Sequence, residues 1–122
     1  MLSCRAFLAI VLTAGNWSAA AFAQDARPLS GPEISTAISG NTIKAPTFAE
    51  YYDPDGSIRG LEGEEKYTGS WHVDGDKLCV DFPRHDFKDC VWVALGTDGE
   101  YSFMNGRQTN LRTIVAGNPD GL

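Results

Sequence analysis

Apolar and polar positions alternate along most of the chain after residue 40. In residues 66–74, every second position is apolar or glycine, and the positions between them are polar. Because successive side chains of a strand point to opposite faces, this pattern predicts strands with one buried face. The expected inner face carries Tyr67, Gly69, Trp71, Val73, Leu78, Val80, Phe82, Val91, Val93, Leu95, Tyr101 and Phe103.

Short segments of this kind are separated by turn signals. The segments are TIKA, TFAEYY, SIRGLE, EKYTGSWHV, KLCVDF, DCVWVAL, EYSFMN and LRTIVA, and the breaks include DPDG, VDGD, PRHD and TDGE. Regular short strands with glycine-bearing turns favour an antiparallel meander, and closing the sheet removes its exposed edges. We therefore expect an all-β fold, a small antiparallel meander or a partly open barrel of about eight short strands.

One short N-terminal helix is expected before the strands, lying across one end or one side of the barrel. Ser30 is followed three residues later by Glu33, which is the spacing of a capping box. Pro32 falls in the first turn and Gly40 at the exit, as is typical of helix ends. One face of this helix carries Ile34, Ala37 and Ile38.

The first residues have the features of an export signal. Arg5 precedes the apolar run AFLAIVLTAG, and Ala21 and Ala23 form an A-x-A cleavage site. We expect residues 1–23 to be a cleaved signal peptide and residues 24–122 to be a single β-rich domain. An uncleaved anchor is the alternative, but a spanning helix needs about 20 apolar residues, and this run is interrupted by GN. The expected location is periplasmic or secreted.

The remaining cysteines, Cys79 and Cys90, are expected to form a disulfide in an oxidising compartment, since Cys4 leaves with the signal. A two-cysteine metal site is the alternative, but no C-x-x-C spacing supports it. Pairing the cysteines across a hairpin also places Asp81 opposite Lys88, Phe82 opposite Phe87, Val80 opposite Asp89, Leu78 opposite Val91 and Lys77 opposite Trp92. We expect the apolar helix face to cover the disulfide and Trp92 on the outside of the sheet.

Charge restricts the classes of partner. The chain has 10 basic and 16 acidic residues, a formal net charge of −6 at pH 7. No basic stripe is present, which argues against nucleic acid or an anionic membrane surface as the partner. After residue 23, no stretch of the sequence is apolar enough to span a bilayer.

One stretch, YYDPDGSIRGLE at residues 51–62, partly matches a calcium-binding EF-hand loop. Tyr51 occupies the first position, where calcium requires a carboxylate, and no convincing helix flanks the stretch. The alternative is a hairpin turn, in which Pro54 presets the second position and Gly56 supplies a positive φ. We predict the turn, and we expect no metal and no cofactor.

No catalytic constellation is visible in the sequence, and we expect a protein that is not an enzyme. The histidines, His72 and His85, fall at an outward strand position and in a hairpin tip. No glycine-rich phosphate-binding loop links a strand to a helix.

The segment SWHVDGDKLCVDFPRHDFKDC contains a W-x-V-x-G-D-x-L-C pattern followed by a second cysteine. In these motifs the chain resembles a set of small secreted proteins of proteobacteria. The resemblance implies export and a small disulfide-linked fold, and it carries over no activity and no catalytic residue. It is carried by Trp71, Val73, Gly75, Asp76, Leu78, Cys79 and Cys90, with Asp55, Gly56 and Gly60 upstream and Gly117 and Asn118 downstream.

Two functions remain as hypotheses. The first is a non-catalytic binding module for a small apolar ligand, held at a barrel mouth lined by Tyr51, Tyr52, Tyr67 and Trp71. The alternative is a protein-interaction module, such as a periplasmic inhibitor resembling the small disulfide-linked barrels that block lysozyme. An acidic surface suits a basic protein partner through electrostatic steering. For the aromatic residues themselves the sequence favours a filled interior over either function, because eight-stranded barrels are usually just wide enough for their own side chains.

Overall fold

A computed structural model describes residues 26–106 and 108–122 of the chain. The expected signal peptide, residues 1–23, lies outside the described residues. The elements are β1 (Ala26–Pro28), α1 (Gly31–Ile38), β2 (Asn41–Lys44), β3 (Phe48–Tyr52), β4 (Ser57–Glu62), β5 (Glu65–Asp74), β6 (Lys77–Phe82), a 3₁₀ turn (Pro83–His85), β7 (Phe87–Gly96), β8 (Tyr101–Asn105) and β9 (Gln108–Ala116).

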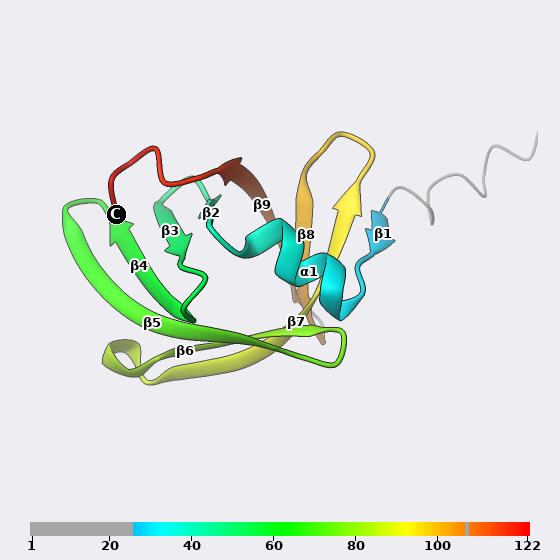
Figure 1. The fold of residues 1–122 in the computed structure, drawn as a ribbon, viewed down its shortest axis with the longest axis horizontal. Coiled ribbons are helices and arrows are strands. Elements are labelled where there is room, and N and C mark those ends of the chain that lie inside the picture. Colours follow the sequence, from blue (N-terminus) through cyan, green and yellow to red (C-terminus); the bar gives the residue numbers. More distant parts are fainter. Residues whose placement is uncertain (1–25, 107) are drawn as a thin grey trace, which may run out of the picture.

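The strands form a closed antiparallel barrel. From β2 to β9 each strand pairs with the next along the chain, and β9 pairs back with β2, which closes a ring of eight strands (Figure 1). The all-β class, the short helix and the barrel are therefore confirmed. The strand β1 was not predicted from the sequence, and it pairs with the second half of β7, beyond the end of β6.

The β6–β7 hairpin has the predicted register. Cys79 lies opposite Cys90, and a disulfide joins their sulfur atoms. The charged pair is present, with the Lys88 Nζ 3.6 Å from a carboxylate oxygen of Asp81. On the inner face the rings of Phe82 and Phe87 lie 6.4 Å apart.

Every residue of the predicted inner face other than Gly69 belongs to the hydrophobic core or packs against it. Gly69 is next to Phe82, where a Cβ atom would approach the phenyl ring to 2.6 Å. The strands therefore alternate as predicted, with an apolar interior and a polar outer face.

Helix α1 closes one end of this interior. Ser30 and Glu33 form the predicted capping box, and Ile34 and Ile38 are completely buried. The Gly31 backbone N–H donates to Oδ1 of Asp76 at 2.8 Å, which fixes the helix start against the β5–β6 turn. The apolar residues packed in the same cluster are Leu29, Ile43, Ile58, Leu78 and Val93.

The helix lies across one end of the barrel, one of the two positions expected, but the prediction that its apolar face covers the disulfide and Trp92 on the outside of the sheet was wrong. The buried helix residues pack with the inner face at one end of the barrel, and Trp92 remains 47% exposed. The physical reason is that the end of the barrel would otherwise leave the inward side chains of β2, β4 and β6 in water. The Trp92 indole contacts Lys77 instead, whose Nζ lies 4.0 Å from the ring centre.

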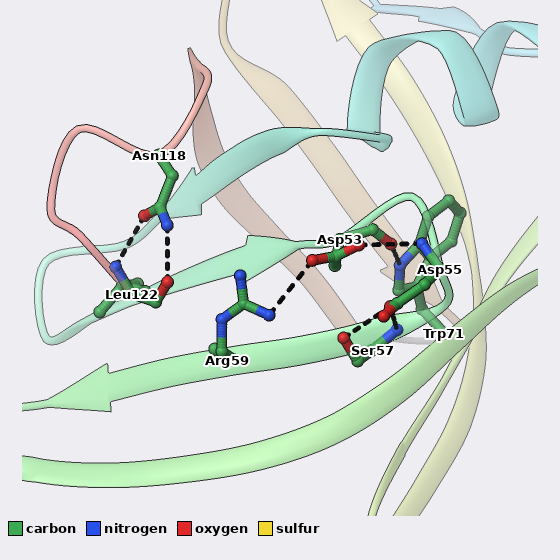
Figure 2. Close-up of polar contacts among 7 residues, drawn as sticks. All are labelled: Asp53, Asp55, Ser57, Arg59, Trp71, Asn118 and Leu122. Carbon is green, nitrogen blue, oxygen red and sulfur yellow. Dashed lines mark hydrogen bonds and ion pairs between the residues drawn. The ribbon is translucent and has the colours of Figure 1, made fainter.

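After β9 the chain folds back near β2. Nζ of Lys44 lies 3.0 Å from a carboxylate oxygen of Asp120. The side chain of Asn118 accepts from the backbone N–H of Leu122 and donates to its carbonyl oxygen (Figure 2). In the part of the chain that the structure describes, no helix is long and apolar enough to cross a bilayer.

Candidate functional site

The end of the barrel opposite α1 contains a cavity of about 240 Å³. This cavity is smaller than the pockets of roughly 300 to 1,000 Å³ that hold drug-sized ligands. The lining residues come from β2, β3 and β6 to β9, and they are Ile43, Phe48, Glu50, Tyr52, Leu78, Val80, Phe82, Phe87, Asp89, Val91, Phe103, Asn105, Gln108, Asn110 and Arg112.

Polarity changes along the depth of the cavity. Ile43 and Leu78, nearest to the helix end, are almost fully buried. The amide side chains of Asn105, Gln108 and Asn110 belong to exposed residues where β8 ends and β9 begins. The cavity, which is the lumen of the barrel, is therefore apolar at its inner end and polar at its opening.

Glu50 is a charged residue in the wall of this cavity. It alternates with Phe48 and Tyr52 on the inner face of β3, and only 7% of it is exposed. The Tyr52 hydroxyl donates to Oε2 of Glu50 at 3.3 Å, and the Tyr67 hydroxyl also hydrogen-bonds the carboxyl group. Among the described residues, Glu50 is the carboxyl-bearing side chain that the fold buries most completely.

A glycine makes the contact between Glu50 and Tyr67 possible. Gly60 of β4 pairs with Glu50 on one side and with Tyr67 on the other. A Cβ atom at Gly60 would lie 2.2 Å from Cζ of the Tyr67 ring, far inside contact distance. The missing side chain lets the tyrosine ring lie across β4 and bring its hydroxyl to the carboxyl group.

The environment raises the pKa of Glu50, Tyr52 and Tyr67. Burial raises the pKa of Glu50 from 4.5 to about 7, although the hydrogen bonds from Tyr67 and Tyr52 and the charge of Arg112 act in the opposite direction. Burial and the neighbouring Glu50 raise the pKa of both tyrosines, so their hydroxyls remain donors at neutral pH. The carboxyl group is thus poised to gain or lose a proton near pH 7.

Two further charged side chains lie toward the mouth. The Arg112 guanidinium stacks over the Phe48 ring at 5.0 Å, and its Nη1 donates to the carbonyl oxygen of Leu111. Oδ2 of Asp89 accepts a hydrogen bond from the Asn105 side chain. The described part of the cavity lining therefore carries two carboxyl groups and one guanidinium group.

The four aromatic residues predicted to line a mouth do not all lie at one opening, although the rings of Tyr52 and Trp71 are 6.0 Å apart. Tyr51 and Tyr52 are neighbours on β3 and point to opposite faces, so Tyr51 lies outside, under the Arg59 guanidinium at 5.0 Å. The Trp71 indole Nε1 donates to the carbonyl oxygen of Asp53 at 2.9 Å and does not line the cavity. Of the four residues, Tyr52 lines the cavity itself, and Tyr67 reaches the site through Glu50.

The DPDG stretch forms the hairpin turn between β3 and β4, as predicted (Figure 2). Oδ1 of Asp53 accepts from the Asp55 N–H, Oδ1 of Asp55 accepts from Ser57, and Oδ2 of Asp53 pairs with Arg59. Gly56 adopts a φ of +93°. The flanking elements are strands, not the helices of an EF-hand. Within residues 26–106 and 108–122, no group of three or more His, Cys, Asp or Glu residues is placed to hold a metal ion.

The residues that carry the sequence resemblance hold the fold together and do not line the cavity, except Leu78. Trp71 is bonded to the β3–β4 turn, Asp76 anchors the helix, and Asn118 organises the C-terminal turn. They account for the shape of the domain.

Sequence reasoning missed Glu50 and Arg112. The signal for Glu50 was present, because alternation in TFAEYY places it on the same face as Phe48 and Tyr52. The same alternation places Arg112 and Asn110 on the inner face of β9 with Ile114. A charged residue inside an apolar alternation is the feature that would have pointed to the cavity.

No protein-family model, curated protein or solved structure matches this chain.

Proposed function

We propose that this protein is a non-catalytic binding protein that holds a small molecule in the lumen of its barrel. The observation that carries the proposal is the cavity of about 240 Å³, with apolar and aromatic walls and one buried carboxyl group. Binding sites for small molecules combine this apolar lining with a few polar groups that orient the ligand. The mouths of β-barrels are a common place for such sites.

The surroundings of Glu50 support binding rather than catalysis. Its hydrogen-bonding partners are tyrosine hydroxyls that remain protonated at neutral pH. His72 and His85, the two histidines of the chain, are exposed and do not line the cavity. The disulfide supports a role outside the reducing cytoplasm, in the periplasm or the extracellular space.

The alternative, an inhibitor of a basic enzyme such as lysozyme, is supported only by the net negative charge. Among the described residues, no surface feature specific to such a partner accompanies that charge. A lysozyme assay tests this alternative directly, and undiminished enzyme activity at excess protein would reject it.

We expect Val80→Phe to abolish binding in the lumen. Val80 lines the cavity from β6, and a phenyl ring at this position would occupy the space that a ligand needs. A ligand-observed NMR screen of molecules with up to about a dozen non-hydrogen atoms should give ligands that bind the wild type and lose at least tenfold in affinity in the variant. Native mass spectrometry of protein from its own source should likewise show a bound small molecule in the wild type only.

The matched control is Ser70→Phe, which adds the same ring on the exposed outer face of β5. This variant should bind the ligands as the wild type does. Ligands that bind all three proteins equally would place the binding site outside the lumen and contradict the proposed function.

A further inference from the structure

Glu50 is surrounded by hydroxyl donors, and Arg112 acts on it through its charge without forming an ion pair. Tyr52 and Tyr67 each supply a hydroxyl, and no lysine or arginine in the described part of the chain forms an ion pair with Glu50. An ionised carboxylate that is 7% exposed loses most of its hydration, and hydroxyl donors replace only part of that loss. A positively charged group in the lumen would supply the missing partner.

The rest of the lumen also favours positive charge. Among the described residues, the charged side chains that line the cavity are Glu50, Asp89 and one cation, Arg112. The Arg112 guanidinium stacks on Phe48 and donates to the carbonyl oxygen of Leu111, and it forms no ion pair with Glu50. With both carboxyl groups ionised, the described lining residues carry a net charge of −1, from two negative groups and one positive group.

Aromatic rings surround the same space. The cavity is lined by Phe48, Tyr52, Phe82, Phe87 and Phe103. The faces of aromatic rings attract ammonium groups, by about 0.5 to 2 kcal/mol depending on solvation. The same rings accept the apolar part of a ligand, so both ends of an amphipathic amine find a suitable surface.

We propose that the lumen selects an organic amine, a small apolar body whose ammonium group pairs with the carboxylate of Glu50. This inference rests on the proposed binding function and names its ligand class. The cavity of about 240 Å³ limits the occupant to one ring or a short alkyl chain with its head group. A hydrogen bond between ammonium and carboxylate is charge-assisted, and such bonds are about twice as strong as neutral ones.

Binding of such an amine is expected to depend on pH. Because burial raises the pKa of Glu50 to about 7, the carboxylate form that binds a cation becomes populated as pH rises from 5 to 8. An alkylamine stays protonated over this range, as a lysine side chain does. The other ionisable groups acting on Glu50 are Tyr52, Tyr67, Glu62 and Arg112, and Asp89 lines the same cavity.

The test uses three probes that share a phenyl ring and differ in the head group. They are 2-phenylethylamine, the neutral 2-phenylethanol and the anionic 3-phenylpropanoate, each titrated calorimetrically into the wild-type protein. At pH 8 we expect the amine to bind at least tenfold more tightly than the alcohol and the anion to bind most weakly. Between pH 8 and pH 5, the affinity for the amine should fall about tenfold or more, while that for the alcohol should change little.

Glu50→Gln keeps the size of the side chain and removes its charge, so it should abolish the preference for the amine and its pH dependence. The control is Glu64→Gln, which removes an exposed carboxylate in the β4–β5 turn and should leave both unchanged. Equal binding of amine and alcohol, no binding of the amine at millimolar concentration, or an unchanged affinity for the amine in Glu50→Gln would each overturn the inference. The screen with Val80→Phe decides separately whether the lumen binds ligands at all.

Discussion

Replacing Glu50 with glutamine is expected to make the protein more stable above pH 7, although the substitution removes a charged residue from the interior. Burial raises the pKa of this carboxyl group from 4.5 to about 7 in the folded protein. Between these values the folded state binds more protons than the unfolded state, so the free energy of unfolding falls as pH rises. The fall begins near pH 4.5 and is complete once the pH passes about 7.

The size of the effect follows from the shift. A shift from 4.5 to about 7 corresponds to on the order of 3 kcal/mol between the two ends of the range, at 1.36 kcal/mol per pH unit. Glutamine retains an oxygen that accepts from the Tyr52 and Tyr67 hydroxyls but does not ionise. Urea unfolding at pH 4.5, 6 and 8 should therefore show a stability gain for Glu50→Gln that is absent at pH 4.5 and largest at pH 8.

Glu64→Gln is the control for this experiment, because its side chain is exposed. Its stability should follow that of the wild type at all three pH values. Destabilisation of Glu50→Gln by the same amount at every pH would mean that the carboxylate is a stabilising charge in the folded protein, which contradicts the burial argument.

Removing the disulfide is the second change with a large expected effect. Cys79 and Cys90 are separated by 11 positions in the sequence, and the chain-entropy model assigns about 2 to 3 kcal/mol to closing a loop of this size. The double substitution Cys79→Ala and Cys90→Ala should lower the free energy of unfolding by that amount. The β6–β7 register should survive in the folded protein, because the backbone ladder and the Phe82–Phe87 contact remain.

A reducing agent provides the control for the disulfide. It should destabilise the wild type about as much as the double substitution does, and it should leave the double variant unchanged. Free thiols at Cys79 and Cys90 in the folded, non-reduced protein would refute the bridge and the register argument built on it.

Much of the barrel was predictable because strand alternation and turn chemistry are local. The register of β6 and β7 followed from one pairing, and it correctly placed Phe82 opposite Phe87 and Asp81 opposite Lys88. The capping box at Ser30 likewise depends on residues close in sequence. Each of these predictions needed only neighbouring positions or a single cross-link.

The errors came from long-range packing. The i, i+4 spacing of Ile34 and Ile38 puts them on one face of the helix, but it does not decide whether that face fills the end of the barrel or covers Trp92. Strand β1 has three exposed residues, so it carries no apolar pattern and exists only because β7 extends beyond β6.

The candidate site was the least predictable part, because a cavity is a property of the closed barrel. Tyr51 and Tyr52 were both predicted to line one barrel opening. Because the pleat of a strand sends adjacent side chains to opposite faces, Tyr51 lies outside and Tyr52 inside. The contact between Tyr67 and Glu50 depends on Gly60. Glu50 is on β3 and Tyr67 on β5, and the tyrosine ring crosses the intervening strand β4 where Gly60 has no side chain.

The central claim is that the barrel buries the carboxyl group of Glu50 beside a lumen that accepts a ligand. Its most direct test is the pH titration of the Glu50 side-chain carboxyl carbon by ¹³C NMR, with and without 2-phenylethylamine. The account predicts a midpoint near pH 7 in the free protein and a lower midpoint when the amine is bound. A midpoint near 4.5 in the free protein, unmoved by the amine, would show a hydrated carboxylate and contradict the account.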